Sequence, residues 1–244
     1  MNKESSLFVK KVKLDREKIN NWNEYPFSVE VIKNLEEITF NKNVTFLIGE
    51  NGIGKSTFIE ALAVALGMNP EGGSHNFMFS TKETHSNLYQ YLKIPIINRP
   101  VTKYFLRAES FYNVVSEIDN LGVKGFYDNK DMHKCSHGES FIHLVKSRFY
   151  PKGLYILDEP EAALSPSRQM TLLCMIDDLA KNGAQFIISS HSPILISYQD
   201  GEILDLNDNF NKVNYEDTDI YKLYKMYLDM PYEMQRRLFQ DNGD

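Results

Sequence analysis

Short apolar runs alternate with helical patterns along most of the chain. Runs rich in β-branched and aromatic side chains predict strands at residues 7–12, 27–32, 44–48, 103–107, 154–157, 185–189 and 202–206. The spacing of apolar side chains predicts helices at residues 55–66, 138–149, 166–182 and 231–239. Buried apolar strands that alternate with helices are typical of an α/β fold with a largely parallel central sheet.

The 244 residues are predicted to form a single domain over residues 1–244, because no internal repeat or low-complexity linker divides them. Residues 69–135 open with a stretch rich in Gly, Ser, Asn and Pro that has weak periodicity, which predicts a lid or small lobe. Residues 221–244 combine a helical pattern with alternating charges. We expect this tail to be helical and to pack on the domain or contact a partner.

The composition excludes several classes of protein. No apolar run approaches the roughly 20 residues that a membrane-spanning helix needs. Residues 1–14 lack the apolar segment of a secretory leader. The two cysteines, Cys135 and Cys174, are too few for a disulfide framework or a four-ligand zinc site. We therefore expect a cytoplasmic protein without an integral membrane segment, and with reduced thiols.

Charge is spread unevenly along the chain, although the formal net charge is −6. Residues 1–18 and residues 130–152 each sum to +3, whereas residues 200–219 sum to −6. The acidic total argues against a surface that is positive everywhere. Because two segments are locally basic, the acidic net charge does not exclude local contact with nucleic acid.

A glycine-rich segment, Gly-Glu-Asn-Gly-Ile-Gly-Lys-Ser-Thr at residues 49–57, joins the predicted strand 44–48 to the predicted helix 55–66. It fits the phosphate-binding pattern G-x-x-x-x-G-K-[ST], in which glycines let successive N–H groups face an anion at a helix N-terminus. The residues predicted to bind a polyphosphate are Gly49, Asn51, Gly52, Gly54, Lys55, Ser56 and Thr57. Lys55 would reach the β- and γ-phosphates and Ser56 would coordinate Mg²⁺. The alternative is a structural Gly-rich turn, which the flanking strand and helix disfavour.

Two carboxylates, Asp158 and Glu159, follow the apolar strand predicted at residues 154–157. At the carboxyl end of a strand beside a phosphate-binding loop, Asp158 would hold Mg²⁺ through its water shell. Glu159 would then face the γ-phosphate and act as the general base for an attacking water. Taken alone, the pair is also consistent with a solvated strand end before a turn at Pro160.

Two further segments carry candidate residues. Ser136-His137-Gly138-Glu139 begins a predicted helix and could bind an anion, but Ser136 and Glu139 also fit a capping box. The predicted strand 185–189 is followed by His191, which would lie beside the strand that precedes the glycine-rich loop. A single histidine is more often structural than catalytic, so neither segment identifies a site by itself.

Together, in this order and spacing, these segments resemble the ATP-binding cassette (ABC) class of P-loop ATPases over about residues 3–206. In that resemblance residues 49–57 match Walker A, residues 136–139 the signature, residues 154–159 Walker B, residues 163–165 the D-loop and His191 the switch histidine. The resemblance implies a mostly parallel sheet flanked by helices, an N-terminal antiparallel β lobe and a small helical lobe. It also implies a dimer in which Ser136, Gly138 and Glu139 contact, in trans, the ATP held by the partner.

The sequence departs from transporter ATPases in two places. The signature has Ser-His-Gly-Glu where transporters have Ser-Gly-Gly-Gln, so His137 adds bulk at the expected dimer interface. No obvious Q-loop glutamine follows the predicted strand 103–107, and Glu109 takes that position as a further candidate metal ligand. Arg107 and Glu109 could instead form a surface ion pair.

The segments Asp158-Glu159-Pro160-Glu161 and Leu164-Ser165-Pro166 look most like those of small stand-alone bacterial ATPases related to SMC, DNA-repair and phage-defence ATPase heads. This resemblance implies ATP hydrolysis, with Lys55, Glu159 and His191 as catalytic residues and ATP and Mg²⁺ as ligands. It also implies ATP-dependent homodimerisation that switches a protein partner or a nucleic acid. Tyr25 and Phe27 are the candidate adenine-stacking residues.

Three other functions are compatible with parts of the sequence. One is the nucleotide-binding subunit of an ABC membrane transporter, which the signature and the missing glutamine disfavour. Another is a nucleotide-gated binding module that hydrolyses little, because His137 could hinder closure of the dimer. A serine hydrolase built on Ser190, His191 and Asp200 is disfavoured, since the chain has no G-x-S-x-G elbow.

Overall fold

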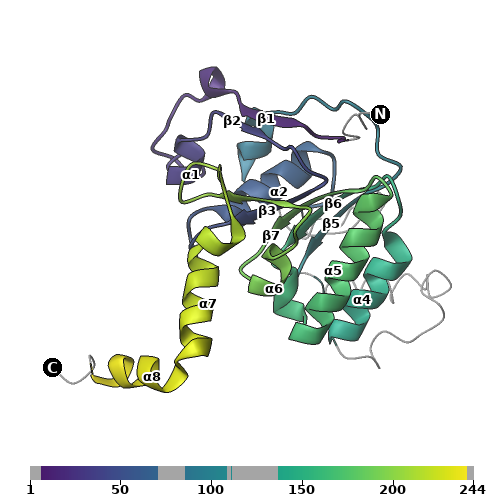
Figure 1. Ribbon diagram of the computed structural model, residues 1–244. Coiled ribbons are helices and arrows are strands. Elements are labelled where there is room, and N and C mark those ends of the chain that lie inside the picture. The colour runs from purple at the N-terminus through teal and green to yellow at the C-terminus, as the bar shows by residue number, and fades with distance from the viewer. Residues whose placement is uncertain (1–6, 71–85, 109–110, 112–136, 241–244) are drawn as a thin grey trace.

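A six-stranded sheet forms the centre of the structure, a computed structural model that describes residues 7–70, 86–108, 111 and 137–240 (Figure 1). The strand order is β5-β6-β7-β3-β8-β9. The first five strands in this order are parallel, and β9 pairs antiparallel with β8. The bounds are β3 Val44–Ile48, β5 Lys103–Arg107, β6 Leu154–Asp158, β7 Gln185–Ser189, β8 Glu202–Asp205 and β9 Asn211–Val213. The α/β fold with a mostly parallel sheet is thereby confirmed.

Helices cover both faces of this sheet because alternate residues of its strands point to opposite sides. Leu47 of β3 and Ile156 of β6 belong to a core shared with α2 (Lys55–Ala65) and the N-terminal part of the chain. Their neighbours Phe46 and Tyr155 belong to a second core. This second core is shared with α4 (His137–Arg148), α5 (Pro166–Lys181) and the short α6 (Pro193–Ile196). The helices predicted at residues 55–66, 138–149 and 166–182 are therefore confirmed to within a residue or two.

A three-stranded antiparallel sheet, in the order β2-β1-β4, forms the N-terminal lobe. Its strands are β1 Lys11–Leu14, β2 Glu37–Thr39 and β4 Leu92–Lys93, accompanied by the short helices η1 (Arg16–Lys18) and η2 (Asn87–Tyr91). The strand predicted at residues 7–12 begins later, since only Val9 of the earlier residues makes an isolated bridge, with Ile96. The antiparallel N-terminal lobe is confirmed.

The strand predicted at residues 27–32 is wrong, because this segment is a turn followed by α1 (Glu30–Lys33). The backbone N–H groups of Ser28 and Val29 bond back to Glu24 and Pro26, and are therefore not available to a strand ladder. Val31 and Ile32 are both buried in the core beside α2. Two adjacent apolar residues can be buried by a single helical turn as well as by a strand. Here the hydrogen-bonded turn around Pro26 leads directly into a helical turn, so the segment does not form a strand.

The described part of the predicted lid, residues 86–108, belongs to the two sheets. β4 completes the N-terminal sheet, β5 is the edge strand of the central sheet, and Leu88 is fully buried in the core. The remainder of residues 69–135 lies outside the described residues, except Asn69, Pro70 and Phe111.

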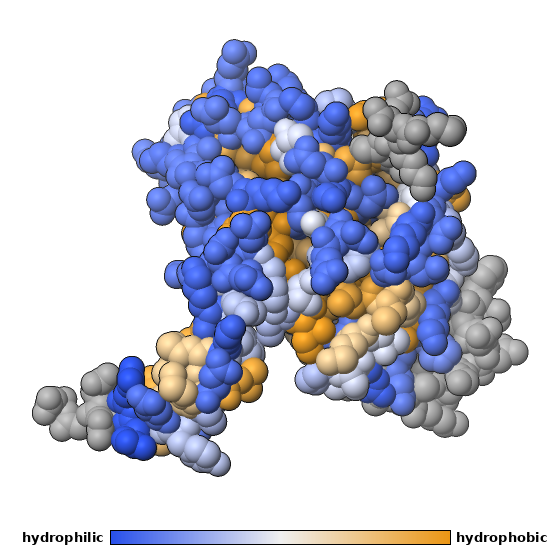
Figure 2. Space-filling model, in the orientation of Figure 1, coloured by the Kyte–Doolittle hydropathy of each residue, from blue (hydrophilic) through white to orange (hydrophobic). Residues whose placement is uncertain are grey.

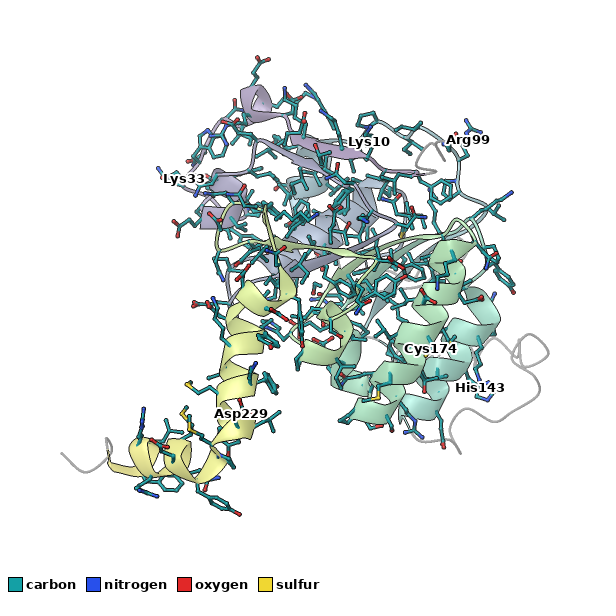
Figure 3. The ribbon with its side chains drawn as sticks, viewed as in Figure 1. Lys10, Lys33, Arg99, His143, Cys174 and Asp229 are labelled. Carbon is teal, nitrogen blue, oxygen red and sulfur yellow. The ribbon has the colours of Figure 1, made fainter. Side chains whose placement is uncertain are left out.

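The C-terminal tail is helical, as predicted. The turn η6 (Tyr215–Asp217) leads into α7 (Asp219–Asp229), whose N-terminus is capped by the Thr218 hydroxyl accepting from the Tyr221 N–H at 3.2 Å. α7 runs away from the body to Asp229, and α8 (Pro231–Gln240) then turns aside (Figures 1 and 3). Large side chains of both helices are exposed, among them Leu228, Tyr232 and Phe239. Figure 2 shows orange, hydrophobic atoms on this tail. Among the described residues, no helix is both long enough and apolar enough to cross a membrane.

Gln185 ties the start of the described chain to the central sheet. Its buried carboxamide oxygen accepts from the N–H groups of Phe8 and Val9 at 2.9 and 3.0 Å, and its Nε2 donates to the Val9 carbonyl at 2.7 Å. Because Gln185→Ala leaves these buried backbone groups without partners, we expect it to lower the free energy of unfolding by about 2–4 kcal/mol. Urea denaturation measures the change. Gln90→Ala, at an exposed glutamine, should stay within about 0.5 kcal/mol, and a loss below about 1 kcal/mol for Gln185→Ala would contradict this account.

Candidate nucleotide-binding site

The predicted site residues meet at the carboxyl edge of the central sheet. Residues 49–54 follow β3, Asp158 ends β6, and Ser190 and His191 follow β7. β7 lies between β6 and β3, so the predicted position of His191 beside the P-loop strand is observed. In parallel α/β sheets this edge is where ligands bind.

Three glycines shape the loop between β3 and α2. Gly49, Gly52 and Gly54 have φ values of 153°, 82° and 110°, which L side chains rarely adopt. A Cβ added at Gly52 would meet nothing within 4 Å, so the loop backbone there is open to approach. No side chain among the described residues caps the N-terminus of α2. The backbone of the loop and the uncapped N-terminus of α2 are therefore accessible to a ligand, as an anion-binding site requires.

Gly54 also has a packing role. A Cβ there would lie 2.7 Å from Val29 Cγ1 and 2.9 Å from Val31 Cγ1. We expect Gly54→Ala to lower the free energy of unfolding by about 2–4 kcal/mol, because strain and steric overlap combine. Gly52→Ala is the matched control, with a positive φ but no overlap, and should cost about 1–2 kcal/mol. Equal losses in thermal or urea denaturation would contradict the packing role.

Lys55 is buried, and its ammonium closes the loop. Nζ donates to the carbonyl oxygens of Gly49 and Glu50, each at 2.8 Å. Burial lowers the pKa of Lys55, and the carboxylates of Glu159, Asp158 and Glu161 oppose this shift. The lysine therefore sits between the loop and the acidic strand end.

Asp158 is buried and held by three neighbours. Ser189 Oγ donates to its Oδ1 at 2.7 Å, Arg107 Nε lies 3.5 Å from its Oδ2, and the Ser56 side chain also hydrogen-bonds to it. Burial raises the pKa of Asp158, and the Ser189 bond and the Arg107 charge oppose this rise. The two predicted metal ligands Ser56 and Asp158 are thereby brought together.

Arg107 and Ser189 were not predicted as site residues. Arg107 pairs with Glu60 of α2 at 2.9 Å as well as approaching Asp158. One signal in the sequence could have identified both residues, because each is the polar last residue of a predicted strand. In the sheet, Arg107 and Ser189 lie opposite Asp158 on the two neighbouring strands. The third predicted metal ligand, Glu109, lies outside the described residues.

Glu159 leaves β6 in a left-handed conformation, with φ 47°. Its side chain is 40% exposed, and its Oε1 lies 3.7 Å from His191 Nε2. Burial lowers the pKa of His191, and the Lys55 ammonium lowers it further. Residues 190–192, which follow β7, are called the switch segment. Glu159 lies next to this segment, so that a solvent-accessible carboxylate and a partly buried imidazole are neighbours.

The signature segment is described only in part. Ser136 lies outside the described residues, and α4 begins at His137. Gly138 is buried and packs closely against Arg168 of α5: a Cβ at this position would lie 2.7 Å from Arg168 Cδ, so a larger residue would overlap it. Glu139 forms an ion pair with Arg168 at 3.0 Å. His143 and Cys174 lie on the same helix pair, α4 and α5 (Figure 3).

The two candidate aromatic residues differ in accessibility. Phe27 is only 5% exposed and packs edge-on against Trp22 and Tyr91, which excludes it as a stacking surface for a base. Tyr25 is 63% exposed, and its hydroxyl lies 3.2 Å from Thr57 Oγ1, next to the loop.

A cavity of about 530 Å³ opens beside the loop, between Gly49–Asn51, His191 and the first two turns of α7. On its β8 side, the Asn207 carboxamide oxygen accepts from the Glu50 N–H at 3.3 Å. The C-terminal tail therefore borders the candidate site, a relation that the sequence pattern of the tail did not indicate.

These residues fit a magnesium-bound nucleoside triphosphate. The glycine turns, the uncapped helix and the Lys55 ammonium suit polyphosphate. A hydroxyl and a carboxylate, from Ser56 and Asp158, are the oxygen ligands that Mg²⁺ prefers. The fold and the order of these loops define a P-loop domain of the ABC ATPase class.

Comparisons with known proteins agree. The AAA-domain family matches residues 18–153, more than half of the chain, and the chain therefore belongs to this family. A second AAA-domain family, described as a putative AbiEii toxin of a type IV toxin–antitoxin system, matches residues 140–197.

Several curated proteins are similar at low identity. The energy-coupling factor transporter ATP-binding protein EcfA2 of Methanospirillum hungatei is 21% identical over 68% of this chain, which spans 46% of that relative's length. The zinc import ATP-binding protein ZnuC of Vibrio cholerae is 26% identical over 71% of this chain and 66% of its own length. Among solved structures, an SMC head domain from Thermotoga maritima has a TM-score of 0.44 at 14% identity, covering 81% of this chain and 95% of its own.

Proposed function

We propose that this chain binds and hydrolyses ATP with Mg²⁺, and that ATP binding closes two copies into a dimer whose reopening switches a partner. The observation that carries the proposal is the meeting of Lys55, Asp158, Glu159 and His191 at one edge of the sheet. The partner is a protein or a nucleic acid, as in DNA-repair or phage-defence systems, and the setting is the cytoplasm.

The surroundings of the described groups support the parts of Lys55, Ser56, Asp158, Glu159 and His191, and the family resemblance supplies those of Glu109 and the signature residues. Lys55 and the loop amides hold the phosphates, and Ser56, Asp158 and Glu109 hold the metal. When bound, Mg²⁺ neutralises developing charge on the phosphates. Glu159, the exposed carboxylate, accepts the proton of the attacking water, and His191 orients the reacting groups beside it. Ser136, Gly138 and Glu139 complete the partner's site in trans.

The test is release of phosphate from Mg-ATP, together with the molecular mass measured by light scattering with and without nucleotide. Hydrolysis that depends on Lys55 and Glu159, accompanied by a nucleotide-dependent doubling of mass, supports the proposal. A monomer that neither binds nor hydrolyses ATP would refute it.

A second candidate is the ATP-binding subunit of a membrane transporter. It is favoured by relatives such as ZnuC, a zinc import ATP-binding protein, and EcfA2, an energy-coupling factor transporter ATP-binding protein. Co-purification of the chain with an integral membrane protein would decide for this candidate. Phosphate release stimulated by DNA or by a non-membrane partner would decide against it.

A further inference from the structure

A second glutamate of the β6 turn, Glu161, contacts the switch segment. It lies on the short helix η5 (Pro160–Ala163), two residues after Glu159. Its Oε1 accepts from the Ser190 hydroxyl at 3.0 Å and from the backbone N–H of His191. These bonds join the turn after β6 to the segment after β7, beyond the last ladder bond between the strands.

Gln169 of α5 holds the same segment from the other side. Its Oε1 accepts from the Ser192 hydroxyl at 2.6 Å, and its Nε2 donates to the Leu164 carbonyl at 3.0 Å. The Ser190 hydroxyl also accepts from the Ser192 N–H at 3.0 Å. Residues 190–192 are therefore held by the side chains of Glu161 and Gln169, and the His191 imidazole lies 3.7 Å from Glu159.

Glu161 is poorly placed to be the general base. Oε1 is already engaged by two donors, and Oε2 is shielded from solvent and has no hydrogen-bond partner among the described residues. A water molecule cannot reach either oxygen without rearrangement, whereas the Glu159 side chain is accessible. The two glutamates of this turn thus occupy different surroundings.

We propose that Glu161 is a positioning residue, whose carboxylate holds the His191 backbone so that the imidazole stays beside Glu159. The inference rests on the proposed ATPase function, in which His191 and Glu159 act together. Because acceptance of two hydrogen bonds is all that this role requires, a carboxamide can replace the carboxylate. A general base cannot be replaced in that way.

The experiment compares Glu161→Ala, Glu161→Gln and Glu159→Gln in the full chain. For Glu161→Ala we expect kcat to fall about 10- to 100-fold, because the reacting groups are misplaced. ATP affinity, measured calorimetrically, should stay within about threefold, since among the described residues Glu161 makes no hydrogen bond to the phosphate loop and the effect of its charge is the smallest of the three that act on Lys55. Glu161→Gln should restore kcat to within about threefold of the unmodified chain, whereas Glu159→Gln should not.

Hydrogen exchange of the His191 amide tests the same contact without nucleotide. Loss of the carboxylate acceptor in Glu161→Ala should speed this exchange roughly tenfold or more, and Glu161→Gln should keep it slow. Glu233→Ala, on the exposed face of α8, is the control and should leave both exchange and kcat unchanged.

Three results would overturn the positioning role: unchanged His191 exchange in Glu161→Ala, unchanged kcat in that variant, or loss of turnover in Glu161→Gln with exchange still slow. The last would make Glu161 itself the reacting carboxylate. If the unmodified chain hydrolyses no ATP, the proposed function fails. The exchange measurement then still decides whether Glu161 holds His191.

Discussion

Glu159→Gln should bind Mg-ATP and fail to turn it over, with kcat lowered about 10²- to 10⁴-fold. Glutamine keeps the size and hydrogen-bonding capacity of the side chain but cannot accept the proton of an attacking water. Because the phosphate loop, Lys55 and Asp158 are unaltered, ATP affinity should stay within about threefold. Phosphate release measures kcat, and calorimetric titration measures ATP affinity.

The same variant should accumulate as an ATP-bound dimer if hydrolysis is what reopens the two copies. Light scattering after incubation with Mg-ATP would show about twice the monomer mass, and removal of Mg²⁺ with a chelator should prevent it. Glu233→Gln on α8 is the matched control, since that glutamate is exposed and pairs only locally with Arg237 at 2.6 Å. Turnover within threefold of the unmodified chain would remove Glu159 from the role of base.

Lys55→Ala should weaken ATP binding about 100-fold or more, because charge-assisted hydrogen bonds to phosphate are each worth about 1.5–3 kcal/mol. The variant also loses the two bonds from Nζ to Gly49 and Glu50 that close the loop. Calorimetric titration with Mg-ATP measures the loss, and nucleotide-dependent dimerisation should disappear with it.

Two comparisons make the Lys55 result specific. Lys181→Ala removes an exposed lysine of α5 that pairs with Asp177, and should leave ATP affinity unchanged. Circular dichroism should show that Lys55→Ala remains folded, since the substitution relieves the burial of a charge. An unaltered ATP affinity in Lys55→Ala would contradict the assignment of the phosphate loop.

The strands and helices that surround the candidate site were largely predictable. The central strands β3, β6 and β7 are buried on both faces, so that a mostly apolar run marks each of them in the sequence. α2 and α5 have clear starts, at the glycine loop and at Pro166. Local pattern and tertiary burial agree at these elements, which is why their predicted bounds hold.

Prediction failed where burial alone did not specify a conformation. The segment around Val31 and Ile32 is apolar enough for a strand, yet its backbone bonds are made within a turn and one helical turn. Residues 7–10 have a strand-like pattern, but the N–H groups of Phe8 and Val9 bond to the Gln185 side chain, and Val9 makes only an isolated bridge with Ile96. The first outcome was decided by local turn bonds that an apolar pattern does not report. The second depends on Gln185, a partner far away in the chain that a short window of sequence does not contain.

The chemical groups of the site were determined by the sequence: Gly49–Thr57, Asp158 and Glu159 follow from residue type and spacing, and His191 follows from the resemblance of the combined motifs to ABC ATPases. Which of these groups share surroundings was decided only by the tertiary structure. Strand order brings Arg107 and Ser189 to Asp158, and the left-handed turn at Glu159 directs Glu161 toward the His191 backbone. Glu159 and Glu161 have the same side chain and lie two residues apart, so the sequence does not distinguish their roles. The folded structure does, because burial and hydrogen bonding depend on neighbours that only folding supplies.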